Sequence, residues 1–272
     1  PPPPPPLYNA TATTEIYTED ASSAASDVYK RQGPAFEGAG VQHGMRATKG
    51  AIEEIWINDE TLEPSFRVIG GVKPRGLCGS GLISLLGEMF LTGVVDKGGN
   101  INSAAQTARV RQGEHGWEYV IAWAEETGHG EDIVITHVDV DNLLRAKAAI
   151  YAGFTVLADS VGIPLELVEQ VLIGGSFGKY INVEKAIEIG LLPDMPWDHF
   201  QFLGNTAVRG AYLALLDRQA RARVKDIATR MTYIELSADN TFYESFMSAL
   251  FLPHTELSRF PSVEAAISKK HT

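Results

Sequence analysis

An apolar run that ends in paired glycines, Val171–Lys179 (VLIGGSFGK), constrains the fold of this chain most. A short apolar strand that enters a glycine pair and continues into a helical segment is typical of an α/β protein. The glycines let a ligand approach the backbone closely and leave N–H groups free at the turn. A tight strand-to-helix turn without any ligand is the alternative interpretation of the same pattern.

Two further glycine clusters lie at similar junctions. The first, Arg75–Gly81 (RGLCGSG), precedes the predicted helix 79–93, whose apolar residues recur at helical spacing. Ser80 and the N–H groups of Gly79 and Gly81 would lie at the N-terminus of that helix, where the helix dipole favours an anion; a purely structural cap is the alternative. The second, Phe202–Gly210 (FLGNTAVRG), predicts a helix cap at Asn205 or Thr206.

The rest of the chain predicts a mixed sheet flanked by helices. Apolar runs predict strands at 51–57, 65–69, 118–122, 132–136, 171–173, 200–203 and 232–236. Helical periodicity predicts helices at 79–93, from a cap at Asp139 or Asp141 to about Gly162, and at 183–190, 206–228 and 240–250. The fold class expected is therefore α/β.

Both ends of the chain differ from this pattern. Residues 1–32 begin with six prolines and continue with an Ala/Ser/Thr-rich stretch that shows no sustained periodicity. The stretch ends in SAASDVYKRQ, which resembles a read-through scar of metagenomic gene models. We expect residues 1–32 to be a disordered or non-native tail, residues 33–263 to form one domain, and residues 264–272 to be a disordered tail.

The composition argues against several classes of function and of cofactor. A net charge of −11 with 44% hydrophobic residues describes an acidic globular protein and argues against nucleic acid as a partner. No apolar run reaches the ~18–20 residues that cross a bilayer, and no signal peptide is recognisable, so a cytoplasmic protein is expected. Cys78 is the single cysteine, which excludes an internal disulfide and a cluster that needs about four thiolates. The histidines show no metal-ligand spacing, so no metal site is expected.

The glycine clusters and their neighbours, taken in order, resemble the C-terminal ATPase module of proteins that reductively activate corrinoid (cobalamin-dependent) methyltransferase systems. That module belongs to the superfamily of acetate and sugar kinases, Hsc70 and actin. The matching stretches are GPAFEGAG (33–40), GMRATKGAIE (44–53), GLCGSGLI (76–83), DNLLRAKAAIYAG (141–153), IGGSFGKYINVEKAIEIGLLPDMP (173–196), LGNTAVRGAYLALL (203–216) and LPHTELSRFPSV (252–263).

The resemblance implies a ribonuclease-H-like subdomain, the second of two that close over ATP and Mg²⁺, here incomplete at its N-terminus. In the family, a phosphate motif of the form DIGTNGE lies shortly before GPAFEG. Here the tail of residues 1–32 occupies that place. Both phosphate loops are thus expected to be missing, so the chain alone is expected to be inactive. The family's iron–sulfur cluster is expected only in a domain absent from this chain. A corrinoid protein, reduced from Co(II) to Co(I), is the implied partner, and a homodimer is a further expectation.

The resemblance also suggests which residues hold the nucleotide; no catalytic residue is assigned. Adenosine would lie against Gly174, Gly175, Phe177 and Gly178, and the ribose or phosphates against Gly79, Ser80 and Gly81. Lys147 lies on the apolar stripe of its helix, either with its ammonium reaching water or in contact with a nucleotide or carboxylate. Glu37 either orients Mg²⁺ or caps a helix.

Two rival functions remain open at this point. One is a small-molecule phosphotransferase of the same superfamily, which would need a substrate-side carboxylate that we do not recognise. The other is a non-catalytic fragment that binds nucleotide or docks to a partner.

Overall fold

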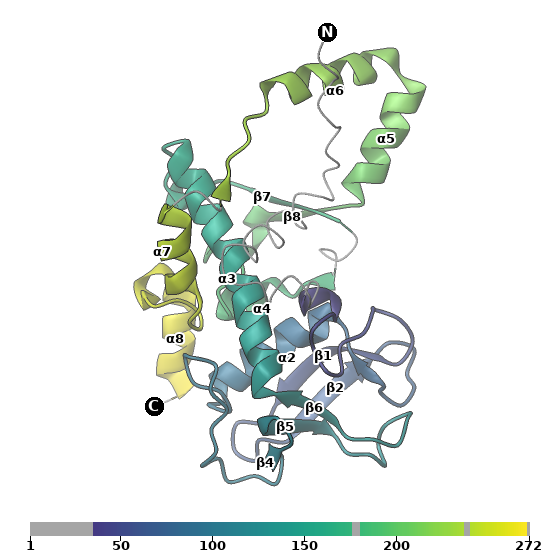
Figure 1. Ribbon diagram of the computed structural model, residues 1–272, viewed down its shortest axis with the longest axis vertical. Coiled ribbons are helices and arrows are strands. Elements are labelled where there is room, and N and C mark those ends of the chain that lie inside the picture. Colours follow the sequence, from purple (N-terminus) through teal and green to yellow (C-terminus); the bar gives the residue numbers. More distant parts are fainter. Residues whose placement is uncertain (1–34, 176–179, 237–239, 271–272) are drawn as a thin grey trace.

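A computed structural model describes residues 35–175, 180–236 and 240–270 (Figure 1). Its central sheet has the order β2-β1-β3, with β1 at Ala51–Ile57, β2 at Pro64–Val68 and β3 at Gly76–Leu77. β1 and β2 pair antiparallel, with Ile57 opposite Pro64, whereas β3 runs parallel to β1. The prediction of two consecutive strands here is confirmed, with β2 beginning one residue earlier than expected.

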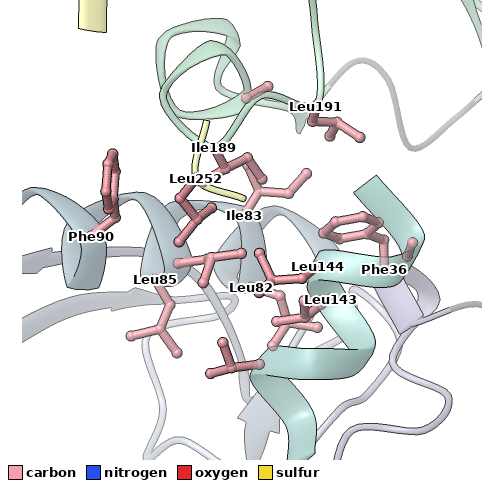
Figure 2. Packing of buried hydrophobic residues seen from close by; sticks show 14 of the residues in the cluster. Phe36, Leu82, Ile83, Leu85, Phe90, Leu143, Leu144, Ile189, Leu191 and Leu252 are labelled. Atoms are coloured by element: carbon pink, nitrogen blue, oxygen red, sulfur yellow. The ribbon is translucent and has the colours of Figure 1, made fainter. Parts of the chain in front are cut away.

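Helix α2 (Gly79–Leu91) covers this sheet, and every residue from Gly79 to Phe90 is buried. Its apolar residues form the centre of the core, where they meet side chains of the long helix α3 (His137–Ser160) and of later segments. Figure 2 shows the packing. The labelled residues are Phe36, Leu82, Ile83, Leu85, Phe90, Leu143, Leu144, Ile189, Leu191 and Leu252.

A second, antiparallel sheet has the order β4-β5-β6, with β4 at Val110–Gly113, β5 at Gly116–Ala122 and β6 at Ile133–Thr136. α3 follows β6 without a loop. Its cap is Thr136 and not Asp139 or Asp141, so that prediction was wrong. Thr136 Oγ1 accepts from the Asp139 backbone N–H at 3.2 Å, and the Asp139 carboxylate accepts from the Thr136 N–H at 3.0 Å. Asp139 is thus the second member of a capping box.

The C-terminal helices lie along α3 (Figure 1). α7 (Asn240–Ala249) packs directly on it, and the short 3-10 helix η7 (Leu257–Arg259) leads into α8 (Pro261–Lys270). Disorder was expected for residues 264–272, but α8 makes residues 264–270 helical. Phe260 and Val263, both at most 1% exposed, anchor the start of this helix in the core.

The part of the chain from η3 to α6 is more open. β7 (Val171–Gly174) and β8 (Phe200–Gly204) form a parallel two-stranded sheet. Between them lie α4 (Val183–Glu188) and the 3-10 helix η5 (Trp197–His199), and η3 (Leu165–Leu167) precedes β7. Helices α5 (Thr206–Leu216) and α6 (Arg218–Arg230) extend away from the body as an arm, and neither contains a buried residue (Figure 1).

Two predictions for residues 206–236 are wrong. A single helix at 206–228 was expected, but the chain breaks at Asp217, which has extended backbone angles and whose carboxylate caps α6 by accepting from the Gln219 N–H at 2.8 Å. Residues 232–236 form no strand, because no neighbouring strand pairs with them in the described part of the chain. The remaining arrangement of small sheets flanked by helices confirms the predicted α/β class. Within the described ranges no helix is long and apolar enough to cross a membrane.

Candidate functional site

A polar pocket of about 280 Å³ opens beside the first half of α2. Three segments form it: β1 and β2, the N-terminal part of α2, and the residues directly before α4. The lining residues are Glu53, Glu54, Arg67, Ser80, Ser84, Tyr180, Ile181 and Asn182. A wider and shallower hollow of about 590 Å³ lies between η5 and the start of α8, but none of the predicted site residues lines it.

The described lining of this pocket contains two carboxylates and one guanidinium. The Arg67 guanidinium donates from Nε to Glu53 at 2.8 Å and from Nη2 to Glu54 at 2.8 Å. One cation therefore serves two carboxylates, and the remaining carboxylate lone pairs can accept from a ligand. The described lining residues thus carry a net negative charge, which favours a ligand group that donates hydrogen bonds.

The two serines on α2 differ in what they offer. The Ser84 hydroxyl donates to the Ile55 carbonyl oxygen at 2.8 Å and accepts from the Ile55 N–H at 3.1 Å, so the backbone of β1 already uses it. Ser80 is 7% exposed, and its Oγ lies 3.4 Å from Cys78 Sγ. Because sulfur is a weak partner, Ser80 is the hydroxyl that remains for a ligand.

The third wall follows the main glycine cluster in sequence. Asn182 caps α4 by accepting from the Lys185 backbone N–H at 3.3 Å, which fixes the end of the segment 180–182. Tyr180 is 60% exposed at the other end of the segment. The structure therefore brings Ser80 of the first cluster and the residues after GGSFGK into one pocket.

The glycine pair itself lies outside this lining. The Gly175 N–H donates to the Gly204 carbonyl oxygen at 2.7 Å, and a side chain at Gly174 would meet Thr206 Oγ1 at 2.7 Å. Gly175 has φ +106°, and among the described residues nothing lies within 4 Å of the place where its Cβ would be. The predicted contacts of Phe177 and Gly178 lie outside the described residues.

Gly79 and Gly81 begin α2 as predicted, but Gly81 has a packing reason. A Cβ at Gly81 would lie 2.2 Å from the Ile52 carbonyl oxygen, so the helix could not approach β1 this closely with any other residue. The Gly81 contact with β1 thus explains this glycine without a ligand.

Neither interpretation of Lys147 describes its environment. Its side chain is 0% exposed, and its ammonium donates to the carbonyl oxygens of Phe251 and, at 2.7 Å, Pro253. Burial holds the pKa of Lys147 well below its ordinary value. Lys147 fixes the segment before η7 to α3 and lies away from the pocket. Glu37 ends the 3-10 helix η2 (Ala35–Glu37), and the prediction for its side chain lies outside what the structure describes.

Sequence reasoning missed most of the lining. Two adjacent glutamates in the strand AIEEIWI, Glu53 and Glu54, interrupt an apolar run and are the one local signal that this strand borders a polar site. Arg67, Tyr180, Ile181 and Asn182 carry no such signal, because their role depends on contacts between distant segments.

The side chains that line this pocket can exchange hydrogen bonds with a polar ligand. No cluster of three or more His, Cys, Asp or Glu side chains in the described part of the chain could hold a metal ion. Fold and pocket define an α/β protein with a polar pocket between β1, α2 and the segment before α4. The sequence matches the family described as the C-terminal domain of RACo, the ASKHA (acetate and sugar kinase/Hsc70/actin) domain, over residues 21–264. The chain belongs to this family, as its motifs predicted.

Its relatives are corrinoid-activating proteins. The chain is 38% identical over 222 residues to the corrinoid activation enzyme RamQ of Eubacterium limosum, covering 79% of this chain and 37% of the relative. It is 25% identical over 240 residues to the [Co(II) methylated amine-specific corrinoid protein] reductase of Methanosarcina barkeri, covering 80% and 40%. A solved structure, the reductive activator for corrinoid,iron-sulfur protein, matches with a TM-score of 0.80 and 50% identity, covering 85% and 37%. The chain thus spans about two fifths of these relatives' length.

Proposed function

We propose that this chain is the C-terminal, nucleotide-binding part of an enzyme that activates a corrinoid protein of a methyltransferase system by reduction. The observation that carries the proposal is the 50% identity and TM-score of 0.80 to the reductive activator for corrinoid,iron-sulfur protein. In the reaction, Co(II) gains one electron and becomes Co(I). An iron–sulfur cluster, which needs about four thiolates, would supply the electron from another domain, since Cys78 is the one cysteine of this sequence.

ATP, when bound, supplies the free energy that makes this reduction favourable. Small-molecule sites commonly have volumes of about 300–1,000 Å³, so a pocket of about 280 Å³ fits part of a nucleotide and not the whole. The surplus of carboxylate over guanidinium favours the nucleoside end. In this proposal Glu53 and Glu54 accept from the sugar hydroxyls or the adenine amine, and Ser80 donates to the same end.

A titration of the 272-residue chain with adenosine, ADP and Mg²⁺–ATP tests the nucleotide part. We expect weak saturable binding with Kd on the order of 0.1–1 mM, and no hydrolysis of ATP. Adenosine should bind within about threefold of ADP, because Arg67, the one cation among the described lining residues, is already paired with two carboxylates. ADP binding more than about tenfold tighter than adenosine, or hydrolysis by this chain alone, would contradict the proposal.

A matched pair of variants locates the binding. Glu53→Gln should weaken adenosine binding about five- to tenfold, which is roughly the difference between a charge-assisted and a neutral hydrogen bond. Glu60→Gln changes an exposed glutamate in the loop between β1 and β2, outside the pocket lining, and should leave the affinity unchanged. Equal effects of the two variants would place the nucleotide elsewhere.

The corrinoid part needs a second measurement. The chain should bind a corrinoid protein in the Co(II) state more tightly than the same protein in its methylated Co(III) state, because only differential affinity lets an activator recognise the inactive form. Calorimetry with the two forms measures this difference. Absent binding of both would exclude this chain as the contact to the partner, and equal binding would contradict its preference for the inactive form.

A further inference from the structure

A buried ion cluster lies behind the pocket wall. Lys185 Nζ is 2.6 Å from Glu88 Oε1 and 2.8 Å from Glu188 Oε2. The three side chains are 9–11% exposed, and they join α4, which carries Lys185 and Glu188, to α2, which carries Glu88. A side chain at Gly87 would lie 2.9 Å from Glu188 Oε2, so the glycine makes room for this cluster.

The cluster is connected to the pocket wall through Asn182 and to strand β1 through Glu88. On one side, the Lys185 backbone N–H donates to Asn182, which lines the pocket. On the other side, Glu88 Oε2 accepts from the Ile57 N–H of β1 at 2.9 Å. Ser80, Ser84 and Glu88 are spaced four residues apart and so share one face of α2. A continuous set of bonds therefore runs from the pocket wall at 180–182 to the helix face that carries Ser80.

Burying such a cluster costs desolvation free energy when the chain folds. Burial raises the pKa of Glu188 above its ordinary value, although Lys185 opposes the change. Burial also lowers the pKa of Lys185, but the two carboxylates outweigh this and leave it raised. One cation and two carboxylates thus share a site with little water, and apolar side chains of similar size commonly replace such groups without loss of stability. The cluster is better explained by geometry than by stability.

We propose that Lys185 is a positioning residue that fixes the segment 180–182 at a defined distance from Ser80 and so pre-organises the pocket. This inference rests on the nucleotide site proposed above. A segment already held in place loses little conformational freedom when a ligand binds, which raises the affinity without any new contact. Lys185 touches no ligand itself, because Glu88 and Glu188 occupy its ammonium.

The test compares the wild-type chain with a neutral variant, Glu88→Gln/Lys185→Met/Glu188→Gln. Because the whole cluster loses its charge together, no unpaired ion remains buried and the melting temperature should stay close to that of the wild type. Hydrogen exchange of the amides of residues 180–182, measured without nucleotide, should become about tenfold faster. The affinity for adenosine should fall about fivefold. The single variant Lys185→Arg keeps the charge and both carboxylates, so it should keep most of the wild-type exchange protection and of the affinity for adenosine.

A similar cluster elsewhere provides the control. Arg111 also pairs with two carboxylates, Glu118 at 2.8 Å and Asp132 at 2.9 Å, on the β4-β5-β6 sheet. Arg111→Met should change neither the exchange of residues 180–182 nor the affinity for adenosine.

The outcomes separate this inference from the proposed function. Unchanged exchange in a folded neutral variant would overturn the role of Lys185, and so would faster exchange with an unchanged affinity. A neutral variant that fails to fold would show that the cluster serves stability, which also overturns the inference. Faster exchange in a chain whose wild type binds no adenosine would support positioning by Lys185 and contradict the nucleotide site.

Discussion

Helices α2 and α5 follow similar glycine junctions, yet the protein treats them in opposite ways. Every residue of α2 from Gly79 to Phe90 is buried, whereas α5 has no buried residue and its Leu215 is 75% exposed. Both helices are rich in leucine. The difference teaches that an apolar pattern identifies a helix but not the surface that covers it. We expect unfolding of the body around α2 to determine the stability of this chain, and the α5–α6 arm to contribute little.

The strongest test of this comparison truncates one leucine in each helix. Leu85 on α2 is 0% exposed, so Leu85→Ala should lower the free energy of unfolding by about 2–5 kcal/mol through lost burial and the cavity left behind. Leu215→Ala on α5 should change it by less than about 0.5 kcal/mol. Urea unfolding of both variants measures the two values. A large loss for Leu215→Ala would show that the arm is covered in solution.

Acid should weaken the body through His254. Burial, with help from the nearby Arg259 and Lys147 charges, lowers the pKa of His254 to about 4, and its Nδ1 accepts from the Glu256 N–H at 3.0 Å. The unfolded chain takes up this proton near pH 6.5, so its stabilising contribution is complete above pH 6.5 and is lost as the pH falls toward 4. The loss should be about 1–3 kcal/mol.

His254→Gln should remove this part of the pH dependence, because glutamine does not titrate. Unfolding curves at pH 7, 5.5 and 4.5 measure the slope for both chains. Hydrogen exchange over α5 and α6, corrected for the intrinsic effect of pH, should not follow it. A variant with the same slope as the wild type would assign the acid sensitivity to other groups.

A glycine in each helix should give effects of opposite sign. In Gly81→Ala the new methyl would approach the Ile52 carbonyl oxygen to 2.2 Å, which forces α2 away from β1 and should cost about 1–3 kcal/mol. At Gly210 on α5 nothing lies within 4 Å, so Gly210→Ala should stabilise α5 by about 0.5–1 kcal/mol through its helix propensity. Circular dichroism with thermal unfolding records both changes. The comparison between the helices breaks down if the two variants shift in the same direction.

The sequence predicted this fold where local patterns decide it. The apolar stripe of α2 and the run AIEEIWI of β1 identified both elements almost to the residue. The polar face of α2 was not predicted, because serine and glutamate four residues apart usually face water. Here Ser84 and Glu88 bind the backbone of β1 at Ile55 and Ile57, beyond the point where β3 ends. Helix side chains therefore satisfy backbone groups that would otherwise be left unpaired on this edge of the sheet.

The candidate site was predictable only in part, for the same physical reason. Ser80, which lines the pocket, was a candidate because helix N-termini have a local signature. Lys185 and Glu88 lie 97 residues apart in sequence, and neither carries a local sign of the other. The predictions for the Lys147 ammonium were wrong because its partners are the backbone carbonyls of Phe251 and Pro253. Every residue type carries a backbone carbonyl, so the sequence gives no sign of such a partner.

The smallest effects compare the caps of two helices. Thr136 is 4% exposed and caps α3 within the body, whereas Asn205 caps the exposed helix α5 by accepting from the Val208 N–H at 3.0 Å. Each alanine substitution should cost its helix about 1 kcal/mol. Only Thr136→Ala should lower the melting temperature, by about 2–4 °C, because α3 unfolds together with the core. Asn205→Ala should instead speed hydrogen exchange within α5 and leave the melting temperature unchanged. Equal melting shifts would mean that arm and body unfold as one cooperative unit, and the contrast between α2 and α5 would then describe exposure but not stability.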